Sequence, residues 1–384
     1  MPASILADLA LGLRDEWRAF SWRNPRTLQA LRPVLSVLIA VATAHALDLH
    51  DAWWAAITAF MVMQADFGSS FYRGVLRIVG TLCGAALGFL LGPTGAAHPL
   101  LFVALMSAAT WAGLYAALRW RHSYAWVLAL VTFAMVMCEA LAGSAGLGTF
   151  ALERIGNILL GTLACIVVAG LTDRRVLSAV FRRSTPVLAA DPTAHLPTGR
   201  LSESPAQARS IAVHALHGAV VVALLSVVLL VEHLGSFAQA LVTTIAVLVV
   251  PLEAGAAMSD VHGRVVERMV QRLAGCLAAG AIAFASLPLL EGRALWCLLT
   301  LCAGAWLGAF LQSGAPVVRY MAAQFSVAFL MVFVQDSGWN VDRRPAFERL
   351  AGVLAGIAAL GVVLLVSGAL RKLWGRKESK SAGA

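Results

Sequence analysis

Two pairs of arginines stand one helical turn apart in this chain, Arg73 with Arg77 and Arg268 with Arg272. Residues at i and i+4 share one face of a helix, so each pair would present two guanidinium groups in one direction. Guanidinium is always charged and binds carboxylates through paired hydrogen bonds. The spacing therefore favours recognition of organic anions. Ordinary anchoring at the cytoplasmic membrane surface is the alternative, and for a single arginine it is the simpler one.

Carboxylates form the second set of candidate residues. Asp66 precedes the first arginine pair and Glu253 precedes the second. We expect both to pair with the nearby arginines, and proton transport is the alternative because carboxylates at membrane depth are costly and often functional. Glu139 lies in an apolar run and is the best single candidate for a proton-coupling site. It could instead cap the outer end of its helix.

Signatures of enzymes and of cofactor or metal sites are missing from the sequence. There is no GxxxxGK[ST], HExxH or GxSxG motif. The six cysteines fall inside apolar runs without ligand spacing. We therefore predict no enzymatic activity, no cofactor and no metal. The net charge of +9 does not predict nucleic-acid binding, because the basic residues lie between apolar runs, as in cytoplasmic loops.

The elements that must position these residues are membrane-spanning helices. The chain is 60% hydrophobic and only 13% charged, whereas a soluble domain has about half apolar and about a quarter charged residues. About twelve apolar runs are separated by short polar segments, and a full span needs about 20 residues. The runs that start at Ala52 and Ile78 are shorter, so we expect their helices to continue beyond them. The predicted fold is an all-α polytopic membrane protein.

The apolar runs fall into two copies of one unit. A constant offset relates Arg73, Arg77 and Gly80 to Arg268, Arg272 and Gly275. Tryptophan and arginine are scarce in apolar helices, so further matches at the same offset indicate a duplication; they are Trp111 with Trp306, Glu153-Arg154 with Glu348-Arg349, and Gly161 with Gly356. Six spans in each copy give two parallel repeats. The four arginines could then converge at the pseudo-two-fold axis as a basic inner mouth that attracts anions.

Five segments follow from this organisation. They are an N-terminal amphipathic cytoplasmic segment (1–26), the first six-helix repeat (27–172), a cytoplasmic linker (173–208), the second six-helix repeat (209–371) and a basic cytoplasmic tail (372–384). Most of the 29 lysines and arginines then lie on one side of the membrane, which predicts that both termini are cytoplasmic.

The types and spacing of several other residues within the repeats indicate roles in packing. Gly80, Gly84 and Gly88 share one helical face and would allow another helix to approach closely. The Glu153-Arg154 and Glu348-Arg349 pairs are expected to bond to other helices and fix the fold. Trp54 could stack on an aromatic substrate, although core packing explains it equally well. Gln64 is included with it in the predicted anion path.

The segment AWWAAITAFMVMQADFGSSFYRGVLRIVGTLCGAALG resembles the signature of the fusaric acid resistance and aromatic acid exporter family. That signature has a W-a-x-[IL]-T element followed by R-x-x-G-T-x-x-G-a. The matching residues here are Trp54, Ile57, Thr58, Arg77, Gly80, Thr81, Gly84 and Ala85. The second half keeps Arg272 and Gly275 but has Cys276 and Ala279 at the next two positions, so a site there would be asymmetric. The family is distantly similar to plant aluminium-activated malate channels.

The resemblance implies efflux of aromatic carboxylic acids or similar weak organic acids across a bacterial inner membrane, with the proton gradient as the expected energy source. The implied partners are a small organic anion and membrane lipids, and a second copy of the chain or a periplasmic adaptor is left open. Two alternatives stand beside the exporter: a passive organic-anion channel of the same architecture, and a non-transporting membrane scaffold.

Overall fold

The computed structural model describes residues 2–143, 146–173, 205–232, 237–250, 258–290, 292–335 and 344–381. Its regular elements in these ranges are α-helices. Ten of them are long and apolar enough to cross a membrane, and two more are apolar but shorter. Only helices satisfy every backbone polar group within lipid without a partner strand, which explains the architecture. The prediction of an all-α polytopic membrane protein is confirmed.

The first repeat contains six helices. They are α3 (Leu31–Ala46), α4 (Trp53–Val62), α5 (Phe67–Ala97), α6 (Pro99–Arg119), α7 (Ser123–Ala142) and α8 (Leu147–Thr172). The expectation that the run at Ile78 continues is confirmed, because α5 begins well before it at Phe67. The expectation for the run at Ala52 is wrong, since α4 has only 10 residues and the backbone turns away from helical geometry at Met63.

The second repeat has the same order. It consists of α10 (Pro205–Glu232), α11 (Phe237–Leu248), α12 (Met258–Leu290), α13 (Ala294–Gln312), α14 (Pro316–Phe333) and α15 (Arg344–Ser381). Most of the predicted linker, residues 174–204, lies outside the described residues, and α10 already begins at Pro205. The predicted basic tail is the helical end of α15. The short helices α4 and α11 occupy matching places in the two repeats, which in membrane transporters often marks the substrate site.

The two repeats interlock with two-fold symmetry. Helix α3 packs on α13 of the other repeat while α10 packs on α6, and α4 packs on α14 while α11 packs on α7. The two large apolar cores reflect this exchange. One is built mainly from α3, α4, α13 and α14, and the other from α6, α7, α10 and α11. Both of these large cores are therefore shared between the repeats.

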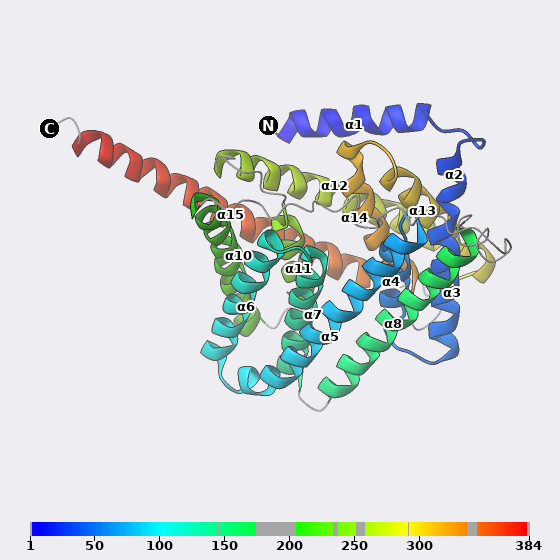
Figure 1. Ribbon diagram of the computed structural model, residues 1–384, viewed down its shortest axis with the longest axis horizontal. Coiled ribbons are helices and arrows are strands. Elements are labelled where there is room, and N and C mark those ends of the chain that lie inside the picture. Colours follow the sequence, from blue (N-terminus) through cyan, green and yellow to red (C-terminus); the bar gives the residue numbers. More distant parts are fainter. Residues whose placement is uncertain are drawn as a thin grey trace, which may run out of the picture.

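An N-terminal helix, α1 (Pro2–Arg18), lies across one side of the bundle, and both chain ends are marked on that side in Figure 1. Its Leu9 is buried against Val318 and Met321 of the second repeat. Trp17, by contrast, is exposed. The short α2 (Pro25–Gln29) then leads into α3, with Asn24 accepting the backbone N–H of Arg26. Helix α1 is thus docked on protein along one face and open along the other.

Candidate functional site

In the first repeat, Arg77 is buried where α4, α5 and α7 meet. Its Nε donates to Thr58 Oγ1 at 3.0 Å, and its Nη1 donates to the Tyr124 hydroxyl at 3.0 Å. Arg73, one turn earlier, lies with its guanidinium carbon 4.4 Å from the centre of the Tyr124 ring. One tyrosine therefore holds both members of the pair, one through its hydroxyl and the other through its ring.

The second repeat rebuilds this cluster. Arg272 is buried, its Nε donates to Thr243 Oγ1 at 3.2 Å, and its Nη1 donates to Gln324 Oε1. The Arg268 guanidinium carbon lies 4.7 Å from the centre of the Tyr320 ring. The Tyr320 hydroxyl donates to the Ala246 carbonyl at 3.3 Å, and its side chain also interacts with Arg272. Gln324 is therefore an additional partner of the deeper arginine in the second repeat.

Close helix approach brings these groups together. A Cβ added at Gly80 would collide with the Ala125 carbonyl oxygen, and one at Gly275 would collide with the Met321 carbonyl oxygen. Ala125 and Met321 each follow directly on the tyrosine of their repeat. The glycines therefore let α5 and α12 lie close enough to α7 and α14 for the arginines to reach their partners. Gly84 and Gly88 also face α7 at contact distance, as the sequence predicts.

Each arginine pair is held within its own repeat. Among the described residues, the hydrogen bonds and ring contacts of these arginines do not join the first pair to the second. The predicted convergence of all four arginines on one inner mouth remains a prediction. The deeper arginines are buried by neutral partners, so their charges are not simply anchored in headgroups.

A cavity of 520 Å³ adjoins the second cluster. Its polar lining is Gln239 of α11, Arg272 of α12 and Gln324 of α14, and the remaining walls are mainly apolar. At its rim Phe284 and Phe347 make an edge-to-face contact, with ring centroids 5.7 Å apart, and both rings are substantially exposed. The apolar walls come from α12, α14 and α15; they include Cys276, Gly280, Ala281, Val327, Ala328 and Met331.

The charge of the Arg272 guanidinium group is not neutralised by any described side chain. Within the described part of the chain, the partners of Arg272 are the neutral side chains of Thr243, Gln324 and Tyr320, and no described carboxylate pairs with this arginine. A buried cation without a counter-charge is costly. The cavity thus offers a positive charge beside an apolar volume, which suits a carboxylate attached to an apolar body.

Two protein-family models match parts of this chain. The model of the fusaric acid resistance protein family matches residues 26–234, more than half of the chain. The chain belongs to the fusaric acid resistance protein family. A second model, described as fusaric acid resistance protein-like, matches residues 250–366. The distant similarity to plant malate channels stays a prediction.

Curated relatives each match a part of this family member. It is 31% identical over 177 residues to the p-hydroxybenzoic acid efflux pump subunit AaeB of Edwardsiella tarda, which covers 41% of this chain and 27% of the relative. The proteins of the same name from Musicola paradisiaca and Escherichia fergusonii are each 27% identical, covering 38% and 44% of this chain and 24% and 28% of theirs. The matches therefore span about a quarter of each relative. No solved structure matches.

Asp66 of this family member does not pair with Arg73 or Arg77 in the described structure. It caps α5 instead, accepting the Ser69 backbone N–H at 2.9 Å, because the first turn of a helix has unpaired N–H groups. Burial raises the pKa of the Asp66 carboxyl, but the hydrogen bonds from Ser69 outweigh it and the pKa is lower than usual. An acid held ionised at neutral pH is a poor proton carrier. Its predicted counterpart Glu253 lies outside the described residues.

The other predicted residues are spread over the fold. Glu139 lies in the last turn of α7, which ends at Ala142, and is partly buried. Glu153 binds His50 Nδ1 at 2.9 Å, and Gln64 uses its amide on the neighbouring Met63 carbonyl. Glu348 is exposed on α15, and the side chain of Arg349 is not among those described.

Trp54 and Arg154 form a buried stack in the first repeat. The Arg154 guanidinium carbon lies 3.5 Å from the centre of the Trp54 ring. Trp54 is 8% exposed and Arg154 is 4% exposed, so neither faces solvent. The sequence analysis missed Tyr124, Tyr320 and Gln324 as arginine partners. The alignment of the two tyrosines in the duplication was the signal that could have found the first two.

Proposed function

We propose that this protein exports small aromatic or similar weak organic acids across a bacterial inner membrane, with both termini in the cytoplasm. One observation carries the proposal: the buried guanidinium of Arg272 at the wall of an apolar cavity. A carboxylate entering the cavity would supply the missing counter-charge, and its apolar body would fill the apolar walls. The names of the relatives, p-hydroxybenzoic acid efflux pump subunits, support the same class of substrate.

The proton gradient is the proposed energy source, and Glu139 is the proposed carrier. Asp66 is a weaker candidate because its pKa is lowered. The word subunit in the relatives' names supports a partner, which we propose is a periplasmic adaptor or a second copy of the chain. These two proposals are separate from the site itself, and either can fail while the site stands.

Transport into everted membrane vesicles tests the proposal. Vesicles from cells that produce the protein should accumulate radiolabelled p-hydroxybenzoate when a proton gradient is imposed. Arg272→Gln should lower the initial rate about 10- to 100-fold, since a charge-assisted hydrogen bond is worth about 1.5–3 kcal/mol. The matched control is Arg319→Gln, because Arg319 is exposed and bonds only the Gly314 carbonyl nearby; its rate should not change.

Four results would contradict the proposal or one part of it. Normal transport by Arg272→Gln at normal protein level would remove the site. Uptake that persists at channel-like rates after a protonophore would favour the passive anion channel. Equal uptake in vesicles with and without the protein, over a panel of aromatic and aliphatic acids, would favour the non-transporting scaffold. Full proton-driven transport by Glu139→Gln would exclude that residue as the carrier.

A further inference from the structure

We infer that the duplicated chain holds a single organic-acid pocket, in the second repeat, and that the equivalent place in the first repeat is filled by its own side chains. This rests on the proposed function and deepens it, because it fixes the number of ligands and the residues that select them. The inference starts from two arginine clusters that match closely while their surroundings differ.

The register between the repeats is set by close backbone contacts. A Cβ at Gly161 of α8 would collide with the Ala55 carbonyl oxygen and meet Thr58. A Cβ at Gly356 of α15 would meet the Ala240 carbonyl oxygen and Thr243 in the same way. These contacts align α4 with α11 residue by residue. The residue directly before Ala240 is Gln239, so its counterpart before Ala55 is Trp54.

Trp54 occupies the volume that is empty beside Gln239. An indole is much larger than a glutamine side chain, and here it is buried with the Arg154 guanidinium stacked on its face. Nε and Nη1 of Arg154 have no hydrogen-bond partner in the described structure, so the ring face, together with the charge of Asp51, holds this cation. The first repeat therefore places an internal cation–π pair where the second repeat has a cavity.

The next part of the cavity wall is also more open in the second repeat than the matching place in the first. Gly280 of α12 lines the cavity, and a Cβ added there would meet nothing within 4 Å. The matching position in α5 is Ala85, which is 2% exposed. Helix α8 also packs closely along α5, whereas α15 touches α12 less, which leaves the cavity between them. The second repeat is open where the first is closed.

The chemistry of the lining defines the ligand class. Arg272 lines the cavity with only neutral partners described, so its charge can bind one carboxylate, and the amide groups of Gln239 have no described side-chain partner. Gln324 gives its oxygen to Arg272, which leaves its amide NH₂ for a ligand. These groups fit a monocarboxylate whose flat apolar ring carries a polar substituent. In the first repeat Leu128 stands in place of Gln324, so this polar contact is lost as well.

A binding measurement with a cavity-filling variant tests the inference. The full chain in lipid nanodiscs is titrated with p-hydroxybenzoate by isothermal calorimetry, and we expect one ligand per chain. Gly280→Leu should weaken binding about tenfold or more, because its side chain would enter the cavity that Gly280 lines. Gly368→Leu is the matched control, since Gly368 is also helical and a Cβ there meets nothing within 4 Å, but it does not line this cavity. Its affinity should equal that of the wild type.

The outcomes separate this inference from the proposed function. Two equivalent ligands per chain, or unchanged affinity in a folded Gly280→Leu, would overturn the single pocket while transport stands. Arg77→Lys and Arg272→Lys give a second check, because only the latter should weaken binding, and equal weakening would overturn the inference. A wild-type chain that neither binds nor transports any acid in the panel contradicts the proposed function itself. If titration with lipid or detergent in place of the acid released the same heat of binding, the proposed ligand class would be overturned.

Discussion

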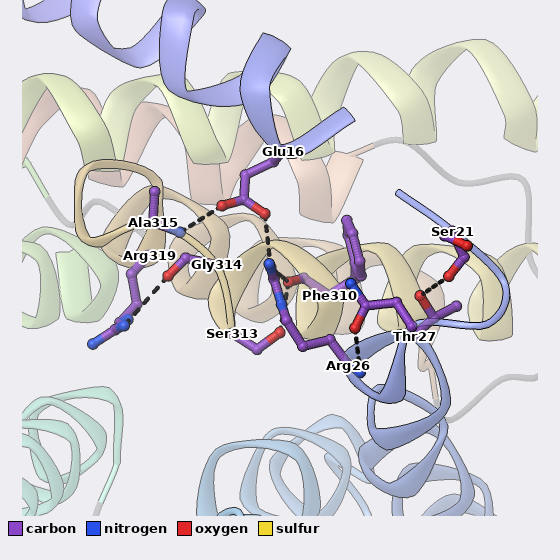
Figure 2. A network of polar contacts seen from close by, with 10 residues as sticks. Glu16, Ser21, Arg26, Thr27, Phe310, Ser313, Gly314, Ala315 and Arg319 are labelled. Atoms are coloured by element: carbon purple, nitrogen blue, oxygen red, sulfur yellow. Dashed lines mark hydrogen bonds and ion pairs between the residues drawn. The ribbon is translucent and has the colours of Figure 1, made fainter. Parts of the chain in front are cut away.

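Glu16 is a carboxylate that the protein buries in order to fasten one element to another. Its Oε1 accepts the Ala315 backbone N–H at 2.6 Å, and its Oε2 accepts from Arg26 Nη2 at 2.7 Å. Figure 2 shows this carboxylate reaching down from α1 to the start of α14 and to Arg26 beside Phe310. The Arg26 guanidinium carbon also lies 5.0 Å from the centre of the Phe310 ring. A single side chain thus links the N-terminal helix to the helices that line the cavity.

Removal of this carboxylate should release α1. Glu16→Ala leaves the Ala315 N–H and the Arg26 guanidinium without their acceptor, which costs about 1–3 kcal/mol. We expect amide hydrogen exchange in α1 to rise by about one to two orders of magnitude, while exchange in α5 stays the same. The neighbouring Asp15→Asn is the matched control, since Asp15 is exposed. Unchanged protection of α1 in Glu16→Ala would mean that the apolar contacts of Leu9 hold the helix alone.

At the scale of elements, a glycine allows close packing at one position and leaves open space at another. Gly80→Ala places a methyl group on the Ala125 carbonyl oxygen, so α5 must move away from α7, at a cost of about 1–3 kcal/mol. Gly280→Ala meets nothing and should stabilise α12 by about 0.5–1 kcal/mol, the helix propensity gained. Thermal unfolding in one detergent should therefore shift in opposite directions for the two variants. A shift of the same sign in both would contradict the packing described for α5 and α7.

The sequence was sufficient to predict the helices, but it was insufficient to predict the partners of their functional side chains. The hydrophobic runs predict the spans, and the constant offset between Arg77 and Arg272 predicts the duplication. The burial of those arginines by Thr58, Thr243 and Gln324 depends on contacts between helices, which no local pattern encodes. The burial of Glu16 likewise depends on a contact between helices, in this case with α14 of the second repeat. Asp66 was assigned to an ion pair, although its place just before α5 is typical of an N-cap.

At the scale of the whole molecule, the exchange of packing partners makes the two repeats one unit. Because α3 and α4 pack on α13 and α14, while α10 and α11 pack on α6 and α7, each short helix lies against helices of the other repeat. A ligand beside α11 and α14 therefore acts on helices that both repeats share. This coupling is compatible with transport from a single pocket, since the first repeat can serve as the frame against which the second moves.

The parallel arrangement has a sidedness that can be measured. An even number of spans in each repeat returns the chain to the side of α1, and Figure 1 shows the α5–α6 connection on the opposite side of the bundle. In a chain freed of its six cysteines, His98→Cys at that connection should react with a membrane-impermeant maleimide in intact cells. Arg121→Cys, between α6 and α7, should react only in everted vesicles, because basic loops are retained in the cytoplasm. Both positions are exposed, so side chain burial does not explain a difference. Labelling of both from one side would contradict the six-span unit, and the reverse pattern would invert the orientation while leaving the repeats intact.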